Sequence, residues 1–178
     1  MNDIGKDRDK ASRILPSGLE QIRLLAIDID GVLTDGGVYV LDDGSEFRRF
    51  SIRDGLGLKR LIENGIRVAW LSNGNSQTAL HRARHLGIDE VHLGVEDKAT
   101  HLEGICESTG IPLIAVMFIG DDLTDLSAAS RVGLFCAPRD AAEQVRNAAD
   151  YVTEAKGGHG AVRELCDLLL DGASSPVT

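Results

Sequence analysis

Residues 24–35 read Leu-Leu-Ala-Ile-Asp-Ile-Asp-Gly-Val-Leu-Thr-Asp, an apolar run that ends in two carboxylates and a glycine. Asp28 and Asp30 are two residues apart, so a β-strand would direct both side chains to the same side. Two carboxylates this close stay ionised only when a cation lies between them, and otherwise one holds a proton. The pair indicates a metal-bound carboxylate nucleophile or a carboxylic acid that transfers protons. An exposed Asp-Gly turn is the alternative for this motif taken alone.

The composition predicts one acidic domain. The chain has 178 residues, 43% of them hydrophobic, and a net charge of -9. These values suit a single core and disfavour nucleic acid or an anionic membrane as a partner. Cysteines that are far apart and no apolar leader or membrane span indicate a cytoplasmic protein. We expect a disordered or loosely packed segment at 1–18, a single domain at 19–171 and a flexible tail at 172–178.

Short apolar runs alternate with amphipathic segments from Leu24 onward. This alternation predicts an α/β fold, with a Rossmann-like, mostly parallel sheet flanked by helices. The expected strands are residues 24–29, 66–71, 90–93, 114–119, 132–136 and 151–153. The expected helices lie near 55–64, 76–86, 98–109, 123–130, 141–148 and 161–170. A β-hairpin at 38–51, turning at Asp42-Asp43-Gly44, is expected to project over the Asp28 loop as a flap. No separate cap domain fits between these elements.

Polar residues follow the carboxyl ends of the expected strands. They are the Asp28/Asp30 pair, Ser72, Lys98, and Asp121 with Asp122. A parallel sheet gathers such positions at one edge, so we expect them to share one site. Carboxylate oxygens at an open site suit Mg²⁺, and hydroxyl, amide and ammonium groups suit the oxygens of a phosphoryl group. The arrangement predicts a magnesium-bound phosphate with a carboxylate in line to attack phosphorus.

This ordered set resembles the haloacid dehalogenase-like superfamily of phosphohydrolases. Its motifs are Asp-x-Asp-Gly, a Ser or Thr after a strand, a lone Lys or Arg, and an acidic pair after glycine. The resemblance implies that Asp28 is the nucleophile and forms an aspartyl-phosphate. It implies that Asp30 protonates the leaving alcohol and then deprotonates the attacking water. It also implies that Ser72, Asn73 and Lys98 bind the phosphoryl oxygens.

The same resemblance implies a set of metal ligands. Asp28, Asp121 and the backbone carbonyl of Asp30 would hold Mg²⁺, with Asp122 or Asp125 in support. For Asp125 an exposed acid on a helix surface is an equally open interpretation. The implied cofactor is therefore Mg²⁺, and the implied reaction is hydrolysis of a phosphate monoester.

From about residue 24 to 170 the chain is similar to one family of that superfamily, the 3-deoxy-D-manno-octulosonate 8-phosphate phosphatases of lipopolysaccharide synthesis. The matching segments include Asp30-Gly-Val-Leu-Thr-Asp-Gly36, Arg53-Asp54-Gly55 and Gly157-Gly-His-Gly-Ala-Val-Arg-Glu164. The resemblance implies a homotetramer in which one subunit's flap approaches a neighbour's site. Arg53, Asp54 and His159 are candidate substrate-binding residues, although a surface ion pair is an alternative role for Arg53.

The second motif departs from that family, which usually reads Thr-Gly-Arg-Lys-Ser. Here residues 72–76 are Ser-Asn-Gly-Asn-Ser, so Gly74 and Asn75 replace two cations that can pair with a sugar-acid carboxylate. A nonulosonate 9-phosphate or a different phosphorylated sugar remains open as the substrate. A further alternative is a non-catalytic assembly module, related to domains fused to sialic-acid cytidylyltransferases. The acidic pairs and Lys98 favour catalysis, because an inactive domain has no physical reason to keep them.

Overall fold

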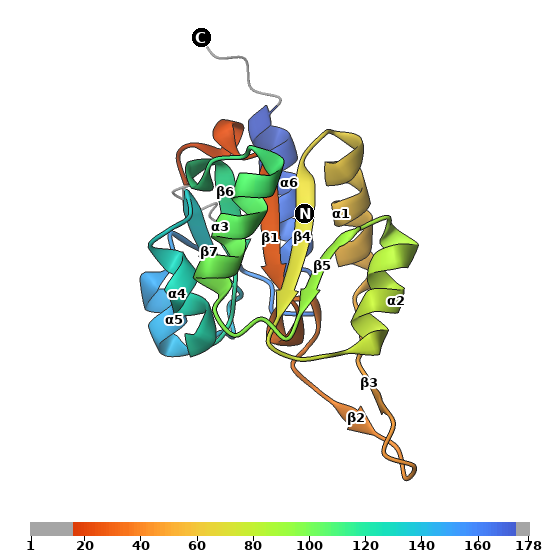
Figure 1. Cartoon of the computed structure of the whole chain (residues 1–178). Helices are drawn as coiled ribbons and strands as arrows, with labels where there is room; N and C mark the ends of the chain where they lie inside the picture. Colours follow the sequence, from red (N-terminus) through yellow and green to blue (C-terminus); the bar gives the residue numbers. More distant parts are fainter. Residues whose placement is uncertain (1–15, 174–178) are drawn as a thin grey trace, which may run out of the picture.

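A six-stranded parallel sheet forms the centre of the computed structural model, which describes residues 16–173 (Figure 1). The strand order is β5-β4-β1-β6-β7-β8. The strands are β1 (Leu24–Asp28), β4 (Arg67–Ser72), β5 (Glu90–Leu93), β6 (Val116–Ile119), β7 (Leu134–Ala137) and β8 (Tyr151–Val152). The chain moves outward in one direction from β1 to β4 and in the other from β6, so the order reverses beside β1. Ligands bind at such a reversal in α/β sheets.

Helices cover both faces of the sheet, as the alternating pattern predicted. One face carries α1 (Ile52–Glu63), α2 (Gln77–Leu86) and α6 (Ala161–Ala173), and the other carries α3 (Lys98–Thr109), α4 (Leu126–Ala129) and α5 (Glu143–Ala148). Strand β1 is buried on both sides: Leu25 and Ile27 pack into the first layer, and Leu24 and Ala26 into the second. This period of two fixes the direction of Asp28 at the strand end.

Short helical turns connect these elements: η1 (Leu19–Gln21), η2 (Ile29–Leu33), η3 (Leu113–Ala115) and η4 (Leu123–Asp125). Helix α1 begins three residues earlier than expected, because the Ser51 hydroxyl accepts a hydrogen bond from the Asp54 N–H at 3.3 Å and caps the helix. Helix α6 includes Gly172 and Ala173, the first residues of the expected tail. The remainder of that tail and residues 1–15 of the expected N-terminal segment lie outside the described residues.

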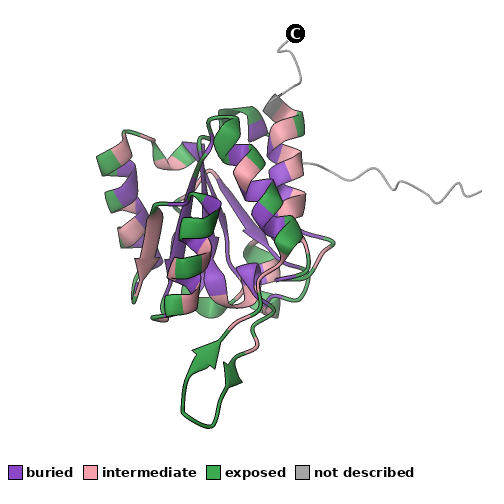
Figure 2. Ribbon diagram, turned by 90° about the vertical axis from the view of Figure 1, so that its right-hand side faces the viewer, coloured by how far each residue is buried: buried purple, intermediate pink, exposed green. Residues whose placement is uncertain are grey.

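The hairpin forms where the Asp-Gly turn predicted it, but it does not cover the Asp28 loop. Its strands are β2 (Tyr39–Val40) and β3 (Glu46–Phe47), and the rings of Tyr39 and Phe47 stack at 4.8 Å. Figures 1 and 2 show it extending away from the body as an exposed arm. The expected position over the site is therefore wrong for the tip of the arm, whereas its base contacts the loop after β1 through the Thr34–Phe50 bridge. Residues 16–173 form no separate cap domain, and none of their helices has the length and hydrophobicity of a membrane span.

Candidate active site

The carboxyl ends of β1, β4 and β6 bring the predicted site residues to one edge of the sheet. Asp28 is the last residue of β1, Ser72 is the last of β4, and Asp121 follows β6 after one glycine. Lys98 opens α3 after β5. Carboxylate oxygens of Asp28, Asp121 and Asp125 lie within 4.8 Å of one another. In the described part of the chain this is the one group of three or more acidic, histidine or cysteine side chains with metal-ligand spacing.

Lys98 is buried between two of these carboxylates. Its side chain is 1% exposed, and its Nζ donates to Asp28 Oδ1 at 2.5 Å and to Asp125 Oδ1. Burial alone would lower the pKa of Lys98, but the Asp28 and Asp125 charges outweigh burial and raise it. Lys98 is therefore charged at neutral pH and holds the Asp28 carboxylate in a fixed orientation.

One ammonium group does not compensate all of the acidic side chains. Burial raises the pKa of Asp28 to about 7, against the lowering effect of Lys98. Burial, together with the charges of Asp28 and Asp125, raises the pKa of Asp121 to about 8. The raised pKa values show that Lys98 alone does not balance the charge of these carboxylates, whose ligand atoms are all oxygens. This donor set fits a hard divalent cation such as Mg²⁺.

Asp125 lies inside this cluster. Its Oδ2 accepts the backbone N–H groups of Asp121 at 2.8 Å and Asp122 at 3.1 Å, and the residue is buried. The interpretation of Asp125 as an exposed helix-surface acid is therefore wrong. Asp122 is exposed instead, and its carboxylate accepts the N–H of Leu123 at 2.7 Å at the start of η4. Of the two proposed supporting residues, the structure brings Asp125 to the cluster and turns Asp122 to the helix end.

Gly31 has the conformation and the small size that this cluster requires. Its φ of 96° lies in the left-handed region, and a Cβ atom there would lie 2.0 Å from Asp121 Oδ2. The Asp-x-Asp-Gly motif thus brings its backbone directly against the acidic pair that follows β6. A second glycine pair supports the same loop, because Gly158 N donates to Val32 O at 2.8 Å and a Cβ on Gly157 would lie 1.7 Å from Gly31 O.

The loop after β4 forms the other side of the site. The buried Ser72 hydroxyl accepts the N–H of Gly74 at 3.0 Å. The Asn73 side chain donates to the Val95 carbonyl at 2.7 Å, which joins this loop to the segment before Lys98. That contact gives the Asn73 side chain a structural role. A phosphate contact by Asn73 would therefore be made by its backbone N–H. A Cβ on Gly74 would lie 3.4 Å from both Ser72 Oγ and Asp30 Oδ2, so position 74 faces the site.

Sequence reasoning did not identify Arg48. Its Nε donates to Asp30 Oδ1 at 2.6 Å, although the two residues are 18 positions apart. Asp30 is at the rim, with 34% of its side chain exposed. One signal in the sequence could have indicated this contact. Arg48 directly follows the second strand of the hairpin, where the chain returns to the Asp30 loop.

The three candidate substrate-binding residues do not share one role. Asp54 is buried, accepts the N–H groups of Gly160 at 3.3 Å and Arg163 at 2.8 Å, and so anchors the start of α6. Its burial raises its pKa. These contacts give Asp54 a structural role, and its role in substrate binding stays a prediction. Arg53 and His159 line a hollow of about 420 Å³ that lies beside the loop following Asp30.

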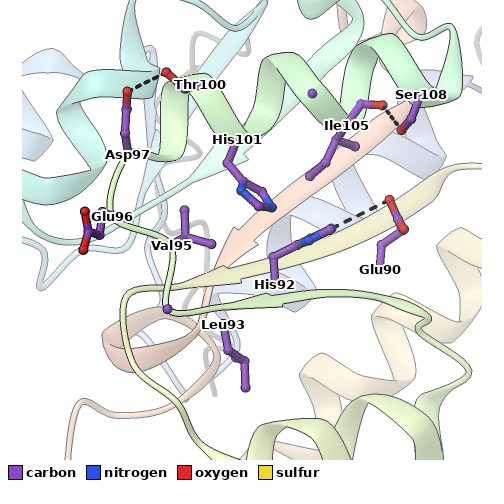
Figure 3. Close-up of a pocket in the computed structure, with 12 residues that line it drawn as sticks. Glu90, His92, Leu93, Val95, Glu96, Asp97, Thr100, His101, Ile105 and Ser108 are labelled. Carbon is purple, nitrogen blue, oxygen red and sulfur yellow. Dashed lines mark hydrogen bonds and ion pairs between the residues drawn. The ribbon is translucent and has the colours of Figure 1, made fainter.

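A larger hollow, of about 670 Å³, lies between the edge strand β5 and α3 (Figure 3). His92 and His101 face each other in it with ring centroids 4.4 Å apart, and Glu90 Oε2 lies 3.9 Å from His92 Nε2. Its lining contains none of the site carboxylates. The sequence did not indicate this histidine pair, because the two residues come from different elements.

Three comparisons with known proteins agree with this geometry. A family model described as haloacid dehalogenase-like hydrolase matches residues 75–165. The 3-deoxy-D-manno-octulosonate 8-phosphate phosphatase KdsC of Escherichia coli K12 is 40% identical over 151 residues, which are 85% of this chain and 80% of that protein.

Two solved structures of 3-deoxy-D-manno-octulosonate 8-phosphate phosphatases are also similar. The Moraxella catarrhalis enzyme, in complex with magnesium, phosphate and the sugar acid, has a TM-score of 0.84 and 40% identity, covering 86% of this chain and 88% of that one. The cobalt-bound Haemophilus influenzae enzyme has a TM-score of 0.84 and 38% identity, covering 87% and 91%. The chain therefore belongs to the haloacid dehalogenase-like hydrolases and, within them, to the family of 3-deoxy-D-manno-octulosonate 8-phosphate phosphatases.

Proposed function

We propose that the protein is a magnesium-dependent phosphatase whose substrate is 3-deoxy-D-manno-octulosonate 8-phosphate. The observation that carries this proposal is the buried Asp28 carboxylate, held by Lys98 and grouped with Asp121 and Asp125. The magnesium, phosphate and sugar acid in the Moraxella catarrhalis relative support the cofactor and the substrate class. A non-catalytic assembly module is not favoured, because the nucleophile, lysine and acidic group are all present.

The carboxylates of Asp28 and Asp121 would hold Mg²⁺, together with the backbone carbonyl of Asp30. Asp125 already accepts bonds from Lys98 and two backbone amides, so we assign it the role of fixing the other groups. When bound, the ion would neutralise negative charge on the carboxylates and on the phosphoryl oxygens. Ser72 and Lys98 lie at the same sheet edge and would donate hydrogen bonds to those oxygens.

The reaction would proceed in two displacements at phosphorus. An oxygen of Asp28 attacks phosphorus, the bond from phosphorus to the sugar oxygen breaks, and Asp30 gives its proton to that oxygen. Asp30 then takes a proton from water, whose oxygen attacks the aspartyl-phosphate and releases inorganic phosphate and Asp28. The rim position of Asp30, 34% exposed, suits a group that must contact both a departing sugar and an entering water.

Phosphate release by variants of Asp28 tests this proposal. Asp28→Asn should abolish release from the octulosonate 8-phosphate, because a neutral amide cannot replace the carboxylate as the nucleophile. Asp89→Asn, an exposed change before β5, is the matched control and should retain activity. Turnover by Asp28→Asn near the unmodified rate would contradict the covalent mechanism. A screen that found release only from other sugar phosphates would contradict the proposed substrate.

We also propose a homotetramer assembled through the hairpin arm. Its exposed apolar side chains, which suit burial against other copies, are Val38, Tyr39, Val40, Leu41 and Phe47. Light scattering should give the mass of four chains for the unmodified protein and a smaller mass for Val40→Asp. A monomer at all concentrations tested would contradict this assembly.

The proposed domain and compartment remain those expected from the sequence. We propose one catalytic domain over 19–171. A cytoplasmic location agrees with three free cysteines, all buried. Limited proteolysis should leave the 19–171 region intact, and cell fractionation should recover activity in the cytoplasmic fraction.

A further inference from the structure

Arg48 brings a guanidinium group to the rim of the proposed site. Its side chain is 11% exposed, and its Nε donates to Asp30 Oδ1 at 2.6 Å. Its Nη1 lies 3.5 Å from Glu46 Oε2. Within residues 16–173, Lys98 and Arg48 are the cationic side chains that form ion pairs with the site carboxylates, which are Asp28, Asp30, Asp121 and Asp125.

These two cations occupy different depths. Lys98 is buried and already bonded to Asp28 and Asp125, beside the position of the phosphoryl group. Arg48 contacts Asp30, the residue proposed to protonate the leaving oxygen. The sugar part of a substrate must therefore extend past Asp30 and toward Arg48.

Among residues 16–173, no other cationic side chain forms an ion pair with Asp30. The Asp30 carboxylate has Arg48 at Oδ1, and a Cβ on Gly74 would lie 3.4 Å from Oδ2. Since residue 74 is glycine, that side supplies no charge. The exposed Asn75 side chain is neutral and lies near Gly94. Arg48 thus supplies the positive charge on the sugar side of the site.

A sugar acid brings a second negative charge into a site already rich in carboxylates, so its binding requires a cation near the sugar. An arginine offers parallel N–H donors that match a carboxylate. The Nη2 of Arg48 has no hydrogen-bond partner among the described residues and can donate while Nε stays on Asp30. We propose that Arg48 binds the carboxylate of the sugar acid and determines the preference for acidic over neutral sugar phosphates. This inference rests on the proposed function.

Arg49 offers a matched control. It is the adjacent residue and also an arginine, but its Nη1 lies 3.4 Å from both Asp35 Oδ2 and His159 Nε2. Its side chain is 49% exposed and pairs with none of the site carboxylates. Arg48→Gln and Arg49→Gln therefore remove the same charge from the same stretch of chain, and only the first removes it from the rim of the site.

The experiment measures kcat/KM for 3-deoxy-D-manno-octulosonate 8-phosphate and for glucose 6-phosphate, a neutral sugar phosphate. Loss of one charge-assisted contact should lower the acidic-to-neutral ratio about 10- to 150-fold in Arg48→Gln, mainly through KM for the acidic substrate. The ratio should stay within about twofold in Arg49→Gln. Inhibition by the free sugar acid, which lacks the phosphate, should weaken by a similar factor in Arg48→Gln, and this measures binding without turnover.

If Arg48→Gln lowered kcat/KM equally for both substrates, the ratio would be unchanged and the inference would be refuted. Arg48 would then act only by positioning Asp30. An unchanged ratio with full activity would also refute it. Circular dichroism of each variant should first establish that the fold is retained, and inhibition by the free sugar acid provides the test where turnover is too low. If the unmodified enzyme releases phosphate only from neutral sugars, the proposed function fails, and that result precedes any comparison of arginine variants.

Discussion

Lys98→Met removes a buried ammonium group and keeps a side chain of similar length. In the metal-free protein this leaves the carboxylates of Asp28 and Asp125 without their ion-pair partner in the interior. Breaking a buried ion pair on one side costs about 3–5 kcal/mol. For a chain of this size we expect Tm to fall by about 6–20 °C. Phosphate release should be lost as well, because Lys98 is a proposed ligand of the phosphoryl group.

The cost should depend on pH. Without Lys98 the pKa of Asp28 rises further, so the carboxyl is protonated and uncharged at lower pH. The difference in Tm between the variant and the unmodified protein should therefore be smaller at pH 6 than at pH 8.5. Both proteins would be measured by calorimetry in the presence of a chelator, so that no metal replaces the missing charge.

Arg60→Met is the control for the loss of an exposed ion pair. Arg60 Nη1 lies 2.9 Å from Asp167 Oδ1, but the two side chains are 50% and 43% exposed. Such a pair contributes about 0–1 kcal/mol. If Lys98→Met destabilised the protein no more than Arg60→Met does, the view of Lys98 as the charge that holds the acidic cluster together would be refuted.

Three other changes test the remaining parts of the site. Asp30→Asn should lower kcat by about 10²–10⁴-fold while Mg²⁺ still binds, and an unchanged kcat would exclude Asp30 as the proton carrier. In metal-free protein the pKa values of Asp28 and Asp121 are raised from 3.8 to about 7 and about 8, so the stability they contribute is present below 3.8 and lost as pH rises through 7 to 8. Tm in chelator should therefore fall between pH 6 and pH 9, and added Mg²⁺ should raise Tm more at pH 9 than at pH 6. A Tm that did not change with pH would contradict this. Gly31→Ala should weaken Mg²⁺ binding measured by calorimetry, because its Cβ would displace Asp121, whereas Gly44→Ala, where the space is open, should not.

The pattern of apolar residues predicted the sheet, because successive side chains of a buried strand must point alternately into the two helical layers. Residues 90–93 and 98–109 were predicted with the bounds that β5 and α3 have. Since strand ends gather at one edge, the positions of Asp28, Lys98 and Asp121 followed from the strand positions alone.

The pattern of apolar residues could not predict contacts between separate loops. Strand patterns gave the position of the hairpin but not its direction, which depends on how few contacts the arm makes with the body. The ion pair of Arg48 with Asp30 and the anchoring of α6 by Asp54 join residues that are 18 or more positions apart. No local period encodes such pairs, so the structure was needed to distinguish Arg48 at the rim from Arg49 and to show how Asp54 anchors α6.

The glycine pair before α6 has a consequence for engineering the C-terminal end of this enzyme. Gly157 and Gly158 rest directly on the backbone of residues 31–34, with a hydrogen bond of 2.8 Å to the Val32 carbonyl. A fused tag or a truncation that displaced the start of α6 would also displace the loop beside Asp30 through this contact. Such a change should therefore affect turnover more than Tm.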